Sequence, residues 1–209
     1  GSLSSYPLWK LAQKTKQKKI KVVISGEGAD EIFGGYVRYM PIYASWKLKQ
    51  NFKSYIPLFD KFYKSYIDGF SSITARNENI DIIKEKMKPI FEIFEDPVNA
   101  MGYFDFKYVM PSLLQMGDRM ASAFGIENRC PFLDKDIIEF GFNLPADEKI
   151  KNFNQKNILR SLLKKRGLSK PLKLEKKGLT ILYNKWFKQD DWNRSNYFKF
   201  LNLRWKELY

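Results

Sequence analysis

The sequence predicts a mostly α-helical α/β protein with one or few parallel strands. One apolar run, residues 20–24, is typical of a buried strand, and a glycine-rich turn with three acids follows it directly. Most of the remaining chain shows helical spacing of apolar residues, interrupted by Pro and Gly. With 209 residues, of which 44% are hydrophobic, the chain can bury one domain-sized core.

Helices are expected on both sides of this strand. Ser4 and Ser5 can cap a helix that ends near residue 18, and a short helix is expected at about 29–33. The other expected helical segments are pieces of 41–97 broken at Pro57, Gly69 and Pro89, one or two helices over 98–123 with a break at Pro111, and helices over 132–142, 154–166 and 179–209. Aromatic residues between Tyr43 and Phe70 are expected to belong to the core.

The composition excludes several classes of protein. Zero histidines argue against a typical zinc site, and the lone Cys130 excludes an intrachain disulfide framework and favours a reduced, cytoplasmic setting. No apolar run approaches the length of a membrane span. The net charge of +14 suits an anionic partner, but dispersed lysines are typical of a solvated surface. Because no zinc-finger, homeodomain or RNP-like pattern is present, the sequence disfavours a nucleic-acid partner.

The turn over residues 25–36 reads S-G-E-G-A-D-E-I-F-G-G-Y. Gly26 and Gly28 free the backbone to bend and to approach a ligand closely. Glu27, Asp30 and Glu31 concentrate negative charge at the start of a helix, where acids also act as caps and dipole complements. On composition alone, a structural and a chemical role for these acids are about equally supported.

The whole dodecapeptide resembles the second signature of the asparagine synthetase family, the synthetase half of glutamine-hydrolysing enzymes. That signature reads S-G-E-G-[AS]-D-E-[LIV]-F-G-G-Y after a strand, and residues 25–36 match it at every position. The resemblance implies an α/β fold of the adenine-nucleotide alpha-hydrolase-like, ATP pyrophosphatase type. It shifts the interpretation of the turn from structure toward chemistry.

A second block, residues 115–134, resembles the third signature of the same family, which is D-R-x-[ST]-M-A-x-x-x-E-x-R-x-P-F-L-D. The charged residues are Asp118, Arg119, Glu127, Arg129 and Asp134, in a stretch otherwise suited to burial. On spacing alone, the preferred interpretation is an ion-paired scaffold in which Arg129 binds Glu127 or Asp134. The resemblance implies that this block supports the wall of the site.

Two further segments resemble family patterns near the phosphates. Residues 156–160 read K-N-I-L-R and resemble K-x-[IL]-L-R on a helix, where Lys156 and Arg160 would share a face. Such a pair is ordinarily a solvated basic face, but the resemblance implies that Lys156 points toward phosphates. Lys176, in K-K-G-L, partly matches R-x-K-x-G-F, and the resemblance implies that it stabilises charge on the reacting phosphate.

Two parts of such an enzyme have no counterpart in the sequence. Family members hold pyrophosphate with an earlier S-G-G-x-D-S loop, and they carry a glutaminase domain with a terminal Cys nucleophile. Residues 1–209 contain neither. We therefore expect them to form a partial asparagine synthetase domain, as a piece of a longer or split protein, and we expect no activity from the isolated chain.

The resemblance implies an ATP-dependent amide-forming ligase that converts aspartate to asparagine through β-aspartyl-AMP, with ammonia from glutamine. Glu27, Asp30 and Lys176 are the expected catalytic residues, with Asp30 on the substrate amino group. Ser25, Gly26 and Lys156 are the expected ATP-binding residues, and Mg²⁺ is expected with the ATP. The alternatives are a related amidotransferase acting on a sugar acid or closing a ring, and a non-catalytic helical fragment that binds a partner chain. A homodimer of the intact enzyme is compatible with the family.

Overall fold

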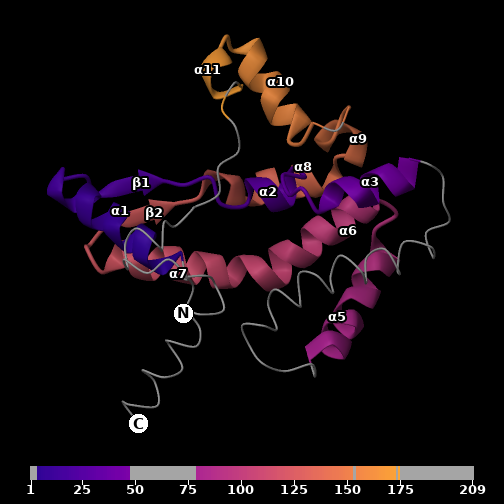
Figure 1. Cartoon of the computed structure of the whole chain (residues 1–209), viewed down its shortest axis with the longest axis horizontal. Helices are drawn as coiled ribbons and strands as arrows, with labels where there is room; N and C mark the ends of the chain where they lie inside the picture. Colours follow the sequence, from indigo (N-terminus) through magenta and orange to yellow (C-terminus); the bar gives the residue numbers. More distant parts are fainter. Residues whose placement is uncertain (1–3, 48–78, 153, 173, 175–209) are drawn as a thin grey trace, which may run out of the picture.

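The computed structural model describes residues 4–47, 79–152, 154–172 and 174 (Figure 1). The helices are α1 Ser5–Gln17, α2 Ala29–Ile32, α3 Tyr39–Lys47, α5 Asn79–Ile93, α6 Pro97–Phe104, α7 Met110–Ser122, α8 Lys135–Asn143, α9 Ala146–Lys149, α10 Asn157–Lys165 and α11 Ser169–Leu172. A π-helix, Asp105–Val109, joins α6 to α7, and a 3-10 turn, Pro131–Leu133, precedes α8. The described part of the chain is mostly helical, as predicted.

A small parallel sheet holds the start of the glycine-rich turn. Strand β1, Val22–Ile24, pairs with β2, Glu127–Arg129, with Val23 opposite Asn128. The Ser25 amide extends the ladder by donating to the Arg129 carbonyl at 2.9 Å. The prediction of one or few parallel strands is therefore confirmed. The short strand β2 was not predicted, because its three residues Glu, Asn and Arg carry no apolar signal.

The expectation that this strand is buried is wrong. Val23 packs with Ala12 of α1, Ala121 of α7 and Ile126. The neighbouring side chains of Val22 and Ile24 are 40% and 76% exposed. Successive side chains of a strand point to opposite faces, so α1 and α7 cover only the face that carries Val23.

The main core lies where α3, α5, α6 and α9 meet. Its buried members are Tyr39, Ile42, Tyr43, Met87, Ile90, Val98, Ala100, Met101, Phe104, Ala146 and Ile150. Asp96 caps α6 by accepting from the Val98 amide at 2.8 Å, and its other oxygen accepts from the Ala146 amide at 2.6 Å. One carboxylate thus fixes the start of α6 to the start of α9.

Helix α6, the π-helix and α7 form one long rod beneath α2 and the sheet (Figure 1). The rod confirms the predicted helix over 98–123, but the break is the π-helix that ends just before Pro111. Pro111 lies in the first turn of α7, where its missing N–H costs nothing. The predicted break at Pro89 is wrong, because α5 continues through it. Pro89 cannot donate to the Glu85 carbonyl, and both residues are exposed, so the proline lies on the solvent side of α5.

Three other predicted helices are present and a fourth is shorter than predicted. The helix from Ser4, the short helix after the turn and the helix after the tight turn at 131 are confirmed by α1, α2 and α8. The helix predicted over 154–166 begins later, at Asn157. Most of the aromatic segment up to Phe70 and the predicted helices over 179–209 lie outside the described residues. Among the described helices, none is long and apolar enough to span a membrane.

Candidate functional site

The glycine-rich turn leaves the sheet at Ser25 and enters α2 at Ala29. Gly28 has a φ of +90°, a conformation that residues with a side chain rarely adopt. A Cβ at this position would lie 2.4 Å from Leu133 Cδ2. The backbone conformation therefore favours glycine here, and any larger residue would also force the Leu133 side chain to shift.

The two predicted nucleotide-binding residues of the turn lie at its outer end. Ser25 Oγ and Cys130 Sγ share a hydrogen bond of 3.1 Å, which joins the two family-like blocks at the ends of β1 and β2. Gly26 is exposed, and no atom lies within 4 Å of the place that its Cβ would take. The backbone at Gly26 is thus open to the close approach of another molecule.

Glu27 and Asp30, the two predicted catalytic acids of the turn, are both partly buried. Burial raises the pKa of the Glu27 carboxyl, and the nearby Asp30 carboxylate raises it further. A higher proton affinity makes a carboxylate a better proton acceptor. Glu27 is therefore a candidate general base beside a second carboxylate.

Lys156 reaches this turn from a distant part of the chain. Its ammonium lies 3.0 Å from Asp30 Oδ1, and the two side chains are 28% and 26% exposed. Lys156 is the residue before α10 and has left-handed backbone angles, φ 52° and ψ 40°. The expectation that Lys156 and Arg160 share a helical face is therefore wrong, since Lys156 lies outside the helix and Arg160 donates to the Gln155 carbonyl.

Gly35 explains how these two side chains meet. A Cβ on Gly35 would lie 1.9 Å from Asp30 Oδ1 and 2.3 Å from Lys156 Cε. Both distances are far below any van der Waals contact. The second Gly of the F-G-G-Y sequence thus makes room for the ion pair, which no sequence pattern had indicated.

Glu31, the third acid of the turn, points into the core instead. It is 3% exposed and accepts a 2.6 Å hydrogen bond from the Tyr36 hydroxyl. Burial raises the pKa of the Glu31 carboxyl, and the Tyr36 hydrogen bond lowers it in part. Adjacent acids of one motif therefore divide between the open side and the core, because successive helical positions are about 100° apart.

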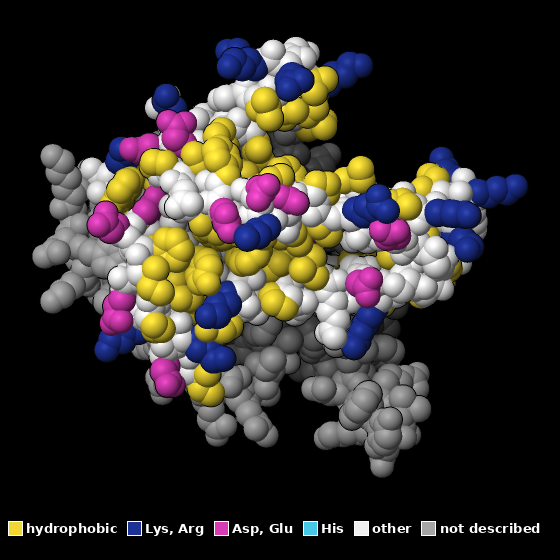
Figure 2. Space-filling model, turned by 180° about the vertical axis from the view of Figure 1, so that it is seen from behind, with side chains coloured by type: hydrophobic (Ala, Val, Ile, Leu, Met, Phe, Trp, Pro, Cys, Tyr) yellow, Lys and Arg dark blue, Asp and Glu magenta, His cyan; other side chains and the backbone are white. Residues whose placement is uncertain are grey.

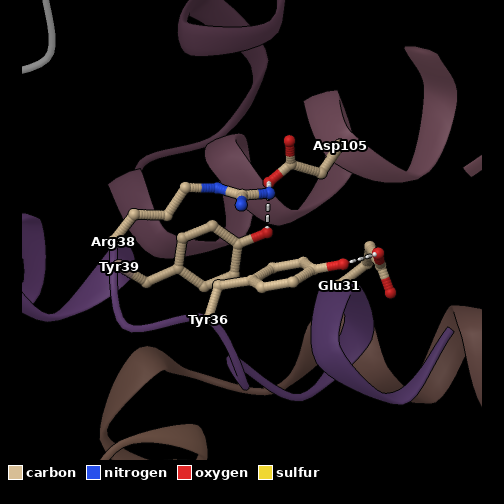
Figure 3. A network of polar contacts seen from close by, with 5 residues as sticks. All are labelled: Glu31, Tyr36, Arg38, Tyr39 and Asp105. Carbon is tan, nitrogen blue, oxygen red and sulfur yellow. Dashed lines mark hydrogen bonds and ion pairs between the residues drawn. The ribbon is translucent and has the colours of Figure 1, made fainter. Parts of the chain in front are cut away.

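A largely buried polar network joins the turn to the π-helix (Figure 3). The Arg38 guanidinium lies 3.9 Å from the centre of the Tyr36 ring and donates to Asp105 Oδ2 at 2.6 Å. The Tyr39 hydroxyl donates to the same oxygen at 2.5 Å. Asp105 is the first residue of the π-helix and is 1% exposed. Sequence reasoning missed Arg38, Tyr39 and Asp105, because neither their spacing nor their types mark them as partners.

Helix α2 also packs against two glycines of the long rod and α8. A Cβ on Gly102 would lie 2.4 Å from the Glu31 carbonyl oxygen. A Cβ on Gly141 would lie 2.0 Å from Ile32 Cγ2. The backbone of α2 is therefore held close to α6 and α8, which limits how far Asp30 can move.

The asparagine synthase family model matches residues 1–195. The chain belongs to the asparagine synthase family. It is 26% identical over 166 residues to asparagine synthetase [glutamine-hydrolyzing] 3 of Bacillus subtilis, covering 70% of this chain and 24% of that protein. It is 26% identical over 227 residues to asparagine synthetase [glutamine-hydrolyzing] 1 of the same organism, covering 92% of this chain and 36% of that protein. The chain thus spans about a quarter to about a third of the length of these relatives. No solved structure was found to match it.

The block that resembles the third signature of the asparagine synthase family lies beside the turn. Glu127 and Arg129 form the expected ion pair at 2.7 Å, but their side chains are 58% and 63% exposed. Asp118, Arg119 and Asp134 are also exposed, so the predicted pairing of Arg129 with Glu127 is confirmed but the charges of this block lie at the surface. Asp134 caps α8 by accepting from the Asp136 amide at 3.0 Å. The block supports the site through the β1–β2 pairing and this cap.

Lys176, the remaining predicted catalytic residue, lies outside the described residues, and its role stays a prediction. Within the described part of the chain, no group of three His, Cys, Asp or Glu side chains could hold a metal ion. These residues do not fit a magnesium ion bound by the protein alone.

On the face shown in Figure 2, Lys and Arg side chains are spread over several elements and interspersed with Asp and Glu.

Proposed function

We propose that this chain forms part of an ATP-dependent amide-forming ligase that converts aspartate to asparagine. Family membership supports the reaction class, and the matched relatives are named as glutamine-hydrolysing asparagine synthetases. The observation that carries the proposal is the convergence of Glu27, Asp30 and Lys156 on one open turn. We also propose the adenine-nucleotide alpha-hydrolase-like fold for the complete domain, with the β1–β2 pair as part of its parallel sheet.

The proposed reaction has two steps. An oxygen of the aspartate side-chain carboxylate attacks the α-phosphorus of ATP, the bond to the bridging oxygen breaks, and pyrophosphate leaves. The nitrogen of ammonia, released from glutamine elsewhere in the enzyme, then attacks the acyl carbon of β-aspartyl-AMP. The acyl C–O bond breaks, AMP leaves with the electron pair, and the nitrogen loses a proton.

The described residues have separate roles in this proposal. The open backbone at Gly26 and the Ser25 hydroxyl contact the nucleotide. Glu27 accepts the proton from the attacking nitrogen, as its raised proton affinity suits. Asp30 binds the α-ammonium group of aspartate. Lys156 and Lys176 offset phosphate charge. Magnesium bound to the ATP phosphates would neutralise part of their charge.

The proposal is tested with the chain co-expressed with a segment that carries an S-G-G-x-D-S loop. Amide formation from aspartate, ATP and ammonia is measured for the unchanged chain, for Glu27→Gln and for Glu139→Gln. Glu139 is an exposed acid of α8 that pairs with Lys135 at 3.7 Å, so it is a matched control. We expect Glu27→Gln to lose about 100-fold or more of the rate, the usual contribution of a general base. Full activity of Glu27→Gln would refute its role, and a loss in Glu139→Gln would show that the change is not specific.

Two substitutes for aspartate distinguish the proposed reaction from the reactions of related enzymes. One is a panel of sugar acids, and the other is a substrate with an internal amine. Amide formation with a sugar acid but not with aspartate would assign the chain to a different branch of the family. Ring closure without added ammonia would assign it to the cyclising relatives.

A further inference from the structure

Lys156 combines three features that a solvated lysine lacks. It forms an ion pair with Asp30, its backbone is left-handed, and its stem crosses the position that a side chain on residue 35 would fill. We propose that Lys156 is an exchangeable latch: Asp30 binds one ammonium at a time, either that of Lys156 or that of an amine-bearing substrate. When the substrate displaces it, Lys156 becomes available to a nucleotide phosphate. This inference rests on the proposed function.

Solvent and ligands can reach the Lys156–Asp30 ion pair. Each side chain keeps about a quarter of its surface exposed, so a ligand can reach the carboxylate without unfolding the turn. Ion pairs with this access to water contribute little to stability, because solvent competes for both charges. Asp30 can therefore change partners at small cost, unlike Asp105, which is 1% exposed.

The backbone at Lys156 is held in an unusual, left-handed conformation. A residue other than Gly rarely adopts left-handed angles, and the conformation stores strain that the surrounding structure must offset. Here the Lys156 carbonyl accepts from the Arg160 amide at 2.9 Å and so begins the first turn of α10. Because the backbone is fixed by that helix, only the flexible side chain needs to move when the pair opens.

The negative charge of Glu27 and Asp30 also favours a bound ammonium at this turn. Glu27 and Asp30 lie close enough for each other's charge to matter at one partly buried turn, so the turn needs a cation nearby. Lys156 supplies that cation in this structure. A substrate ammonium would supply the same charge at the same oxygen, and the displaced Lys156 would then meet the negative charge of the nucleotide. Asp30 therefore keeps one ammonium partner before and after the exchange.

The latch makes a specific prediction about binding. Because each ligand favours the same open position of Lys156, aspartate and nucleotide should bind with positive cooperativity. By linkage, the effect must be equal in both directions. A lysine that binds only phosphate, or only Asp30, would not couple the two ligands.

Calorimetric titration of the co-expressed complex tests this coupling. Aspartate is titrated with and without α,β-methylene-ATP, whose α-phosphorus cannot be attacked to release pyrophosphate, and succinate, which lacks the ammonium, is the control ligand. In the unchanged protein the analogue should tighten aspartate binding by about fivefold or more. In Lys156→Met, aspartate alone should bind more tightly than in the unchanged protein, and the analogue should have no further effect. Succinate should bind equally to both proteins.

Unchanged or weaker aspartate binding in Lys156→Met would overturn the latch. Coupling that survives the substitution would overturn it as well. If the unchanged complex binds no aspartate, the proposed function fails and the latch fails with it. If aspartate supports catalysis but the coupling is absent, the latch alone is wrong.

A double-mutant cycle keeps the ion pair testable without catalysis. Thermal unfolding of the 209-residue chain is measured for Asp30→Asn, Lys156→Met and the double variant. The losses in melting temperature should be small, because the pair is accessible to water, and less than additive, because either substitution removes the same pair. Strict additivity would show that the two side chains do not interact in solution and would overturn the latch.

Discussion

Arg38 and Asp105 form a 2.6 Å ion pair that joins the end of the glycine-rich turn to the π-helix of the long helical rod. Tyr36 and Tyr39, on either side of Arg38, extend this pair, one to Glu31 and the other to Asp105. The motif that carries the candidate catalytic acids is therefore fixed from beneath by groups that take no part in the proposed chemistry.

Breaking this ion pair should destabilise the fold. Asp105→Asn keeps the shape but leaves the Arg38 guanidinium without its carboxylate, at a cost of about 3 kcal/mol, the lower end for a buried pair because Arg38 reaches solvent. Urea unfolding of the chain gives the difference. The matched control is Glu127→Gln, which removes the exposed Arg129 pair and should leave the unfolding midpoint unchanged. Equal losses in the two variants would contradict the assignment.

Gly35→Ala should separate Asp30 from Lys156. The new methyl group overlaps the ends of both flexible side chains, so the pair must open, and the chain should lose at most about 1 kcal/mol, the range for a solvent-accessible ion pair. Gly117→Ala is the control, because this helical glycine has only an ordinary contact of 3.6 Å to Asn128 and should gain stability from helix propensity. Thermal unfolding of both variants checks the prediction, and a Gly35→Ala protein that gains as much stability as Gly117→Ala would refute the overlap at residue 35.

The Glu27 carboxyl should lower stability at neutral pH. Its pKa is raised in the folded chain, mainly by burial, so the folded state binds more protons than the unfolded state between the two pKa values. Stability then falls as pH rises through that interval, and the loss is complete above the folded pKa. Glu27→Gln removes the effect and should melt at a higher temperature than the unchanged chain at pH 7. The difference should vanish at a pH below the ordinary pKa of glutamate, and a lower melting temperature at pH 7 would contradict the account.

Lys149 gives a pH dependence of the opposite sign. It is 1% exposed, donates to Asn99 Oδ1, and burial lowers its pKa to about 7. Between pH 7 and the ordinary lysine pKa, the unfolded chain binds this proton and the folded chain does not. Stability should therefore rise with pH from 7 to 9, by at most about 1.4 kcal/mol per pH unit. Unfolding free energies of Lys149→Met should lack this rise, and an equal slope in both proteins would show that another group causes it.

Sequence reasoning found the turn but not its internal division. The dodecapeptide over residues 25–36 identified the family and placed Glu27 and Asp30 at a strand-to-helix turn, which the structure contains. It could not show that Glu31 faces the core, because the direction of each acid depends on how α2 packs against Gly102 and Gly141. Those contacts join distant segments, and no local pattern encodes them.

The partner of Lys156 could not be predicted from the sequence either. Its motif suggested a cation near phosphates, but its pairing with Asp30 depends on a left-handed residue and on the space above Gly35. Strand β2 was missed for a related reason, since its pairing with β1 compensates for weak strand propensity. Local sequence identified the participants, and tertiary packing determined their partners.

The most direct test of the central claim is aspartate-dependent ATP–pyrophosphate exchange by the chain co-expressed with a segment carrying the S-G-G-x-D-S loop. We expect label exchange between pyrophosphate and ATP that requires aspartate. The exchange should be lost in Asp30→Asn, because the substrate ammonium then lacks the carboxylate that binds it. Exchange that proceeds equally without aspartate, or that is unchanged in Asp30→Asn, would contradict the central claim.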